Sequence, residues 1–474
     1  MKLKENQNVN TFWTQNDKEV VKVNQSKLIQ FLTASGYTKA KKNDGTIMYL
    51  KEKGNIVSEV FDTDIIDFVS NYLKRIDEKN VLEVFSKGVS TFLGPAKLKL
   101  LNTCKILNDR DSKETSTFYF DNISCQVGDK KIEAKMYEDI PNKIWDKRIL
   151  KNNFSFFIKN PKSQFETFCY NLSGQNDERF KALQTIIGYL LHRYQDPKNT
   201  KAIILVDENI SFDDEANGGT GKTLLVQGIE KCRELVTMDG KNIKSKSWFK
   251  NQRIEHTTDL VFYDDVKRSF SLEDLYSEIT TGFTVEKKYK GEIYIKPEDA
   301  PKIIISSNYI VKGTGGNTDV RRRCDFEVSN HYNGKYTPSD EFGNRFFEDW
   351  NEKEWSAFYW FMMSCVLKYF EHGLITPRPI NLKRNGLINS TSIEFVNFME
   401  TGIVTIEEWH SKKATLELFI EEYPHHRNLT PHKFTKWMKV YAKSNELKYE
   451  DKKSGSKYVF YLKNLNMDKE GGDE

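Results

Sequence analysis

The feature that most constrains this chain is a glycine-rich turn between an apolar run and an amphipathic run. Residues 202–206 are all apolar and predict a buried strand, whereas Leu224, Leu225, Val226 and Ile229 have helical spacing. The turn between them ends in Gly-Lys-Thr and consists of Gly218, Gly219, Thr220, Gly221, Lys222 and Thr223. In such a turn, backbone N–H groups and a helix N-terminus surround phosphate oxygens. The sequence therefore predicts an α/β fold with a phosphate-binding loop.

The residue types in this loop indicate a nucleoside triphosphate as the ligand. Lys222 is expected to reach the β- and γ-phosphates, and the Thr223 hydroxyl to hold Mg²⁺, so ATP and Mg²⁺ are the expected cofactors. One position departs from the pattern, because Ala216 stands where the loop usually has glycine. The alternative is a surface glycine-rich turn in which the lysine has no ligand.

Two further apolar runs end in polar side chains that suit triphosphate hydrolysis. Residues 260–263 predict a strand that delivers Asp264 and Asp265, the first to the magnesium shell and the second to the attacking water. Residues 302–307 predict another strand, and it ends at Asn308, whose amide can sense the γ-phosphate. A strand that ends in an ordinary asparagine turn is the alternative for Asn308.

Basic residues follow these strands in two places. Arg321, Arg322 and Arg323 come after a glycine-rich loop, and one guanidinium could complete a γ-phosphate site on a neighbouring subunit. The alternatives are a solvated basic run or contacts to nucleic-acid phosphates. Residues 283–295 predict a hairpin whose tip could grip a DNA backbone and stack on a base, unless it is merely solvated. The tip residues are Lys287, Lys288, Tyr289 and Lys290.

Composition limits the class of protein. The chain has 474 residues, enough for several domains, and 38% hydrophobic with 30% charged residues indicates a globular protein. The net charge of +4 permits a nucleic-acid partner without requiring one. The six cysteines form no Cys-x-x-Cys pair, so neither a zinc site nor a disulfide framework is expected. The N-terminus lacks a signal-peptide pattern and residues 358–370 are too short to cross a bilayer, which favours a cytoplasmic protein without a membrane partner.

The pattern along the chain suggests four parts. Residues 1–155 mix short strands and helices and predict an α+β accessory domain, and residues 156–200 predict a helical collar. Strands and helices alternate in residues 201–376, as in a nucleotide-binding sheet. Residues 390–474 predict two helices and a hairpin with a basic tip, which suggests a winged-helix-like domain that touches DNA. A small α+β module for protein contacts is the alternative.

The phosphate loop, the paired acids, the Lys-Lys-Tyr-Lys hairpin and the Ser-Ser-Asn strand occur in the order found in the superfamily 3 helicases. The chain resembles in particular the phage and poxvirus-type primase-helicases over residues 183–328, including the helix that contains Gly188. This resemblance implies an AAA+-like P-loop ATPase core that forms a hexameric ring and translocates 3′→5′ on single-stranded or forked DNA. It also implies that Lys288 and Tyr289 hold DNA and that Arg322, or next Arg323, is the arginine finger.

The resemblance implies a replicative DNA helicase of phage or mobile-element origin, with replication proteins as further partners. No primase is expected, because the acidic pair Asp62 and Asp64 would need an apolar strand, a third carboxylate and a nearby histidine, and the first histidine is His192. Two other functions remain open: an ATP-switched DNA-binding initiator or loader that does not unwind processively, and a defence or signalling NTPase whose hairpin contacts protein.

Overall fold

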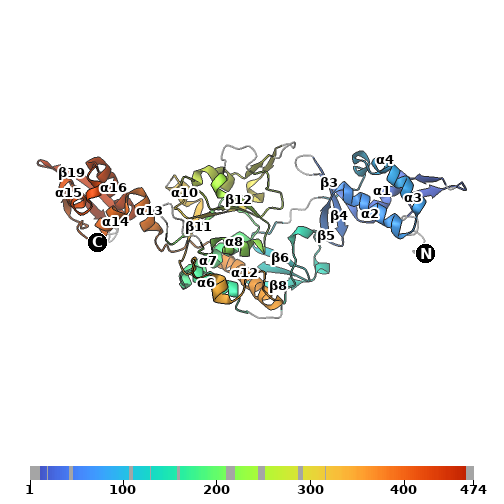
Figure 1. Ribbon diagram of the computed structural model, residues 1–474, viewed down its shortest axis with the longest axis horizontal. Coiled ribbons are helices and arrows are strands. Elements are labelled where there is room, and N and C mark those ends of the chain that lie inside the picture. Colours follow the sequence, from blue (N-terminus) through green and yellow to red (C-terminus); the bar gives the residue numbers. More distant parts are fainter. Residues whose placement is uncertain are drawn as a thin grey trace, which may run out of the picture.

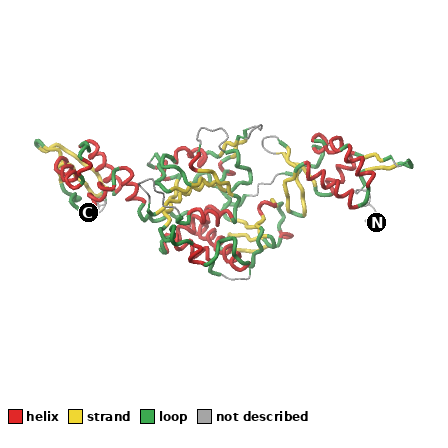
Figure 2. Tube along the Cα trace, in the orientation of Figure 1, coloured by secondary structure: helices red, strands yellow, loops and turns green. Residues whose placement is uncertain are grey.

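The chain forms three bodies along one long axis. The structure is a computed structural model that describes residues 11–465 except 19, 42–45, 106–109, 129, 157–160, 210–218, 244–250, 287–291 and 315. Figure 1 shows the N-terminal body at one end, a larger central body, and the C-terminal body at the other end. The tube in Figure 2 shows that only the central body is built around a broad sheet.

The N-terminal body combines short strands with helices around its own core. That core unites residues from Phe12 to Leu101, among them Leu32, Ile65 and Phe85. Asp62 and Asp64 lie in the first turn of α2, where Asp64 Oδ2 accepts a hydrogen bond of 2.7 Å from the Phe61 amide. These acids therefore cap a helix. The elements are β1 (Trp13–Gln15), β2 (Val21–Val23), α1 (Gln25–Ala34), β3 (Tyr37–Lys41), β4 (Ile47–Lys53), β5 (Ile56–Val60), α2 (Asp62–Arg75), α3 (Lys79–Lys87), α4 (Val89–Leu93) and α5 (Pro95–Leu98).

Most of residues 111–156 pack with the central body, although the sequence grouped them with the N-terminal domain. Ile144 and Trp145 instead pair with β5 of the N-terminal body. Phe118, Phe120 and Phe154 belong to the same buried cluster as the central helices. Arg148 also reaches into the central body, where its Nη1 lies 2.6 Å from Asp259 Oδ2. The strands of this segment are β6 (Thr115–Phe120), β7 (Ser124–Gly128), β8 (Lys131–Lys135), β9 (Ile144–Trp145) and β10 (Ile149–Leu150), and four of them form a sheet in the order β10-β6-β7-β8.

The central sheet has five parallel strands in the order β12-β13-β16-β11-β17. Every residue of β11 and β16 is buried, which explains why their sequences are continuous apolar runs rather than alternating ones. Its strands are β11 (Ala202–Asp207), β12 (Leu235–Asp239), β13 (Leu260–Asp264), β16 (Lys302–Ser307) and β17 (Arg323–Val328).

Helices cover one face of this sheet and short elements cover the other. Ile203 and Ile304 point into a cluster with the four helices α6 (Gln164–Leu172), α7 (Asp177–Leu191), α8 (Lys222–Glu230) and α12 (Glu352–His372). The expected collar, residues 156–200, thus shares the core of the sheet. Ile204 and Ile305 face a second cluster with α9 (Tyr276–Thr280), β14 (Phe283–Val285) and β15 (Ile293–Ile295). Two short helices, α10 (Asn317–Val320) and α11 (Pro338–Phe342), flank β17.

The C-terminal body begins earlier than residue 390. Helix α13 spans Leu382–Ser390, and its Leu387 and Ile388 are buried against Val396. The remaining helices pack on a three-stranded antiparallel sheet in the order β18-β20-β19, around a core that includes Phe419 and Phe460. The elements are α14 (Ile393–Glu400), β18 (Trp409–Ser411), α15 (Lys412–Glu422), α16 (Pro431–Ser444), β19 (Leu447–Ser454) and β20 (Lys457–Asn464). Within the described residues, the helices are too short or too polar to cross a membrane.

Candidate functional site

The described part of the glycine-rich loop has the backbone that only glycine adopts easily. Gly219 and Gly221 have φ values of 94° and 100°, in the left-handed region where a Cβ is strained. Lys222 follows as the first residue of α8, so its side chain emerges at the positive end of a helix. Gly218 lies outside the described residues. The loop is thus shaped by its glycines to place Lys222 at the carboxyl edge of β11.

The Lys222 ammonium is held by two side chains at this edge. Its Nζ donates to Asp207 Oδ2 at 2.5 Å and to Asn308 Oδ1 at 3.0 Å. Asp207 ends β11, and its other oxygen accepts a hydrogen bond of 2.6 Å from Thr220 Oγ1. The Lys222 and Asp207 side chains are only 10% and 3% exposed, so this ion pair is shielded from water. The lysine is therefore fixed in place by its own strand and loop.

The network continues from Asn308 to the second of the paired acids. Asn308 Nδ2 donates to Asp265 Oδ1 at 2.9 Å, and Lys241 Nζ lies 2.6 Å from Asp265 Oδ2. Lysine can only donate, and an ionised carboxylate can only accept, so the Asn308 amide must turn its oxygen to Lys222 and its nitrogen to Asp265. One asparagine thus links the loop lysine to the acid on the neighbouring strand.

The paired acids point in different directions because the backbone turns between them. Asp264 is the last residue of β13, and its Oδ1 accepts a hydrogen bond of 2.7 Å from Ser306 Oγ. Asp265 has a φ of 53°, a left-handed conformation that aspartate tolerates better than most residues. Its amide donates to the same Ser306 hydroxyl at 2.8 Å. Ser306 therefore fixes both acids relative to the Asn308 strand.

The residues at this edge fit a magnesium triphosphate. A buried ammonium, two left-handed glycines and a helix N-terminus suit phosphate oxygens, which are anionic acceptors. The exposed Thr223 hydroxyl and the Asp264 carboxylate supply the hard oxygen ligands that Mg²⁺ prefers. The Asp207 carboxylate opposes an anion here, since it already neutralises Lys222.

The two candidate finger arginines have different surroundings. Arg323 begins β17 and is ion-paired with Asp325, 2.6 Å away, and with Asp319, 3.3 Å away, which raises its pKa further. Arg322 instead donates from Nη1 to the Thr318 carbonyl at 2.9 Å and lies over the Tyr276 ring.

The strand register places these arginines far from the loop lysine of their own chain. Arg323 pairs with Ala202 at the amino end of β11, whereas Asp207, beside Lys222, is at the carboxyl end. Five residues of extended strand separate the two ends by about 17 Å. Arg323 is therefore not placed to reach the Lys222 site of its own chain.

The expected hairpin is described only at its base. Strands β14 and β15 are antiparallel, with Phe283 opposite Ile295 and Val285 opposite Ile293. Phe283 and Val285 are buried in the second face of the sheet, which anchors the hairpin to the central body. The tip residues Lys287, Lys288, Tyr289 and Lys290 lie outside the described residues.

Sequence reasoning missed three residues of this site: Asp207, Lys241 and Ser306. A signal for Asp207 was present, because it directly ends the apolar run that precedes the loop, and carboxyl ends of parallel strands meet at one edge. Ser306 lies on the Asn308 strand itself. Lys241 follows β12 on a short helical turn, and nothing in its local sequence ties it to Asp265.

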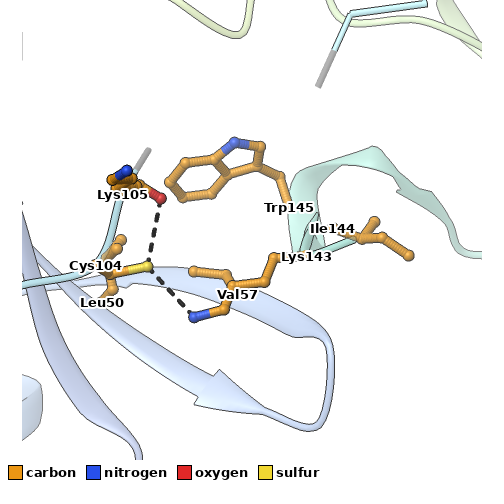
Figure 3. Close-up of a pocket in the computed structure, with 7 residues that line it drawn as sticks. All are labelled: Leu50, Val57, Cys104, Lys105, Lys143, Ile144 and Trp145. Atoms are coloured by element: carbon orange, nitrogen blue, oxygen red, sulfur yellow. Dashed lines mark hydrogen bonds between the residues drawn. The ribbon is translucent and has the colours of Figure 1, made fainter. Parts of the chain in front are cut away.

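A separate small pocket lies between the N-terminal body and the segment that follows it (Figure 3). Its volume of about 10 Å³ admits no more than one water molecule. Burial raises the pKa of the Cys104 thiol, which lies 3.4 Å from Lys143 Nζ. Such a cavity is too small for a substrate. It is lined by Leu50, Val57, Cys104, Lys105, Lys143, Ile144 and Trp145.

Comparison with known proteins gives only loose likenesses. No protein-family model matches the chain, and no curated protein is similar to it in sequence. Two structures of the NrS-1 C-terminal region are 12% identical, cover 92% of this chain and 98% of their own, and have TM-scores of 0.39 and 0.40. JCV helicase, bound to a small acetamide compound, is 10% identical over 50% of this chain and 64% of its own, with a TM-score of 0.26. Similarity this low transfers no function to this chain.

Proposed function

We propose that this protein is a P-loop ATPase that couples ATP hydrolysis to movement on DNA, as in the superfamily 3 helicases. The observation that carries the proposal is the hydrogen-bonded chain from Lys222 through Asn308 to Asp265. It joins a loop lysine, a strand-end amide and a strand-end acid at one edge of a parallel sheet. Ligands of open α/β sheets bind at this edge.

The roles follow from the contacts. Lys222 would neutralise charge on the β- and γ-phosphates, and Thr223 with Asp264 would hold Mg²⁺, which supplies charge stabilisation to the transferred phosphoryl group. Asp265 would accept a proton from the attacking water, while Asn308 orients that water and reports on the γ-phosphate. Asp207 would keep Lys222 aimed at the loop until a phosphate oxygen takes over part of its hydrogen bonding.

The proposal includes a ring because the arginine must come from a second subunit. Within the described residues, Arg322 has one carbonyl partner and no ion pair, whereas Arg323 is held by Asp319 and Asp325. Arg322 is therefore the better candidate for the arginine finger, because fewer contacts would have to break when it meets a phosphate. A homo-oligomer, with six subunits as the expected number, would place it against the phosphates of its neighbour.

A subunit-mixing experiment tests the shared site. Lys222→Ala and Arg322→Ala should each abolish ATPase activity, because each removes one half of every site. A mixture of the two variants should regain activity, since some interfaces then combine an intact Lys222 with an intact Arg322. If the mixture stays as inactive as either variant alone, Arg322 does not act in trans.

The DNA step has its own test. Lys288→Ala should remove the stimulation of ATPase activity by single-stranded DNA and the unwinding of forked DNA, because the lysine would no longer contact phosphates. Normal unwinding by this variant would remove the hairpin from the proposal. ATP-dependent DNA binding without strand displacement by the wild type would instead favour an initiator or loader, and no affinity for single-stranded DNA at low salt would favour a signalling NTPase.

A further inference from the structure

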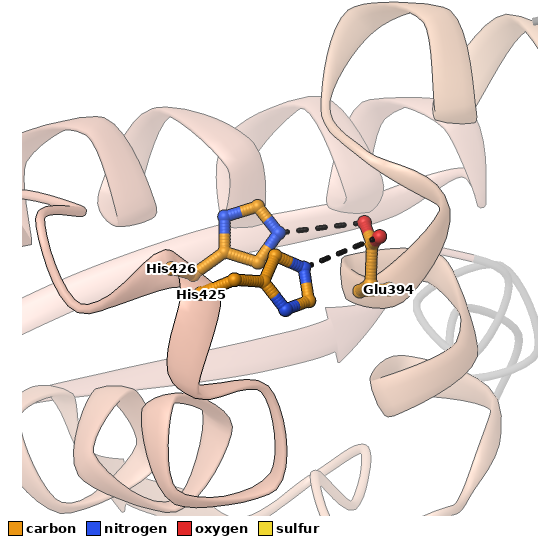
Figure 4. Close-up of side chains that lie close together, drawn as sticks. All are labelled: Glu394, His425 and His426. Atoms are coloured by element: carbon orange, nitrogen blue, oxygen red, sulfur yellow. Dashed lines mark hydrogen bonds and ion pairs between the residues drawn. The ribbon is translucent and has the colours of Figure 1, made fainter. Parts of the chain in front are cut away.

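Two histidines and a glutamate converge in the C-terminal body, away from the nucleotide site. Glu394 is the second residue of α14, and His425 and His426 lie in the short 3₁₀ turn, residues 424–426, that connects α15 to α16. Figure 4 shows both imidazoles directed at the carboxylate, one at each oxygen. The three ligand atoms all lie within 4.8 Å of one another. Glu394 is 31 positions before His425, the first of the two adjacent histidines, so only the fold brings the glutamate to them.

The spacing of these groups fits a shared metal ion as well as it fits hydrogen bonds. Each histidine Nε2 lies 3.4 Å from its Glu394 oxygen. A charge-assisted N–H···O bond is usually about 2.7–2.9 Å. In a tetrahedral zinc site with bonds of about 2.0–2.1 Å, neighbouring ligand atoms are about 3.4 Å apart. The two observed separations, measured to different oxygens of Glu394, are each close to the length of one edge of such a tetrahedron.

The surroundings orient two of the three ligands and leave the third open. The His426 ring contacts Phe419 and Trp437, with ring centroids 5.2 and 5.8 Å away. The Glu394 carboxylate is also held by hydrogen bonds from its own backbone and from Ser392. The His425 side chain is 61% exposed, which leaves space for a water ligand. Such outer contacts are what fixes metal ligands in position.

We propose that Glu394, His425 and His426 bind a divalent transition-metal ion of the zinc type, with water as the fourth ligand. Two imidazoles and one carboxylate are the ligand set of open zinc sites, whereas Mg²⁺ prefers oxygen ligands alone. Cysteine spacing gave no hint of this site, since none of its ligands is a cysteine. The ion would tie the turn before α16 to α14 and so fix the orientation of α16 in the C-terminal body.

Zinc titration of the metal-free full-length chain tests this site. With excess Mg²⁺ present to occupy the nucleotide site, wild-type protein should bind about one equivalent of Zn²⁺ in its tightest calorimetric step. His425→Ala and Glu394→Gln should weaken that step at least ~10-fold, because each loses a ligand. Because His425 is largely exposed, its replacement leaves the fold intact even where Glu394→Gln does not.

The matched control is His372→Ala. His372 Nε2 also lies 3.3 Å from a glutamate oxygen, that of Glu371, but without the second imidazole of the proposed site. This variant should bind Zn²⁺ like the wild type. Co²⁺ provides a second readout, since a tetrahedral site gives visible d–d absorption that His425→Ala should lose. Zinc binding that His425→Ala leaves unchanged, or no zinc step in the wild type, would overturn the proposal.

Discussion

The buried pair of Lys222 and Asp207 allows the structural role of the loop lysine to be separated from its catalytic role. Lys222→Met removes the ammonium but leaves the Asp207 carboxylate, which is 3% exposed. Thr220 Oγ1 still donates a hydrogen bond to this carboxylate. Removing one partner of a buried ion pair costs about 3–5 kcal/mol, because the other charge stays without compensation. Lys222→Met should therefore destabilise the central sheet as well as abolish ATPase activity.

Replacing the unpaired Asp207 carboxylate with an amide should restore stability but not ATPase activity. In the double variant Lys222→Met, Asp207→Asn, the amide carries no charge and can still accept from Thr220, so most of the lost stability should return. ATPase activity should remain absent, because the phosphates still lack their lysine. Hydrogen exchange of the β11 amides measures the local free energy of opening, and phosphate release measures activity.

Lys241→Met is the matched control for this cycle. It makes the same chemical change at a lysine that also pairs with a strand-end acid, but the Lys241 and Asp265 side chains are 62% and 34% exposed. Exposed ion pairs contribute little to stability, so exchange at β11 should hardly change. Two results would contradict this role of the buried pair. One is that Lys241→Met destabilises the sheet as much as Lys222→Met does; the other is that adding Asp207→Asn to Lys222→Met restores no exchange protection of the β11 amides.

Three further results are expected. In a urea titration, Gly188→Ala should lower the free energy of unfolding by about 1–3 kcal/mol, since the new Cβ would lie 2.1 Å from the Cys365 carbonyl oxygen, where α7 packs on α12. Gly386→Ala is the control, because a Cβ there meets no atom within 4 Å, and it should be neutral or stabilising in the same titration. Burial lowers the pKa of Lys302 from 10.5 to about 7, so the unfolded chain binds more protons between these values and the free energy of unfolding should rise with pH there. Lys302→Met should flatten that rise, and an unchanged slope would contradict the assignment. Tyr276→Ala should reduce ATPase activity less than Arg322→Ala does, because the Tyr276 ring contacts the Arg322 guanidinium but would not itself meet the phosphates.

The local sequence determined the elements of the central body. Continuous apolar runs predicted β11, β13 and β16, and each is a strand with its polar residue at the carboxyl end. The glycines before Lys222 predicted a loop with left-handed residues, which Gly219 and Gly221 have. These features depend on contacts within a few residues, where hydrophobic periodicity and backbone sterics act directly.

Tertiary structure alone decided how these elements combine. Strand order places β16 between β11 and β13, and this arrangement brings Asn308 between Lys222 and Asp265. The packing of residues 111–156 on the central helices was hidden for the same reason, because an apolar face does not reveal which other face will cover it. The burial of Asp207 against Lys222, and the meeting of Glu394 with two histidines, likewise depend on chain segments that sequence spacing cannot position.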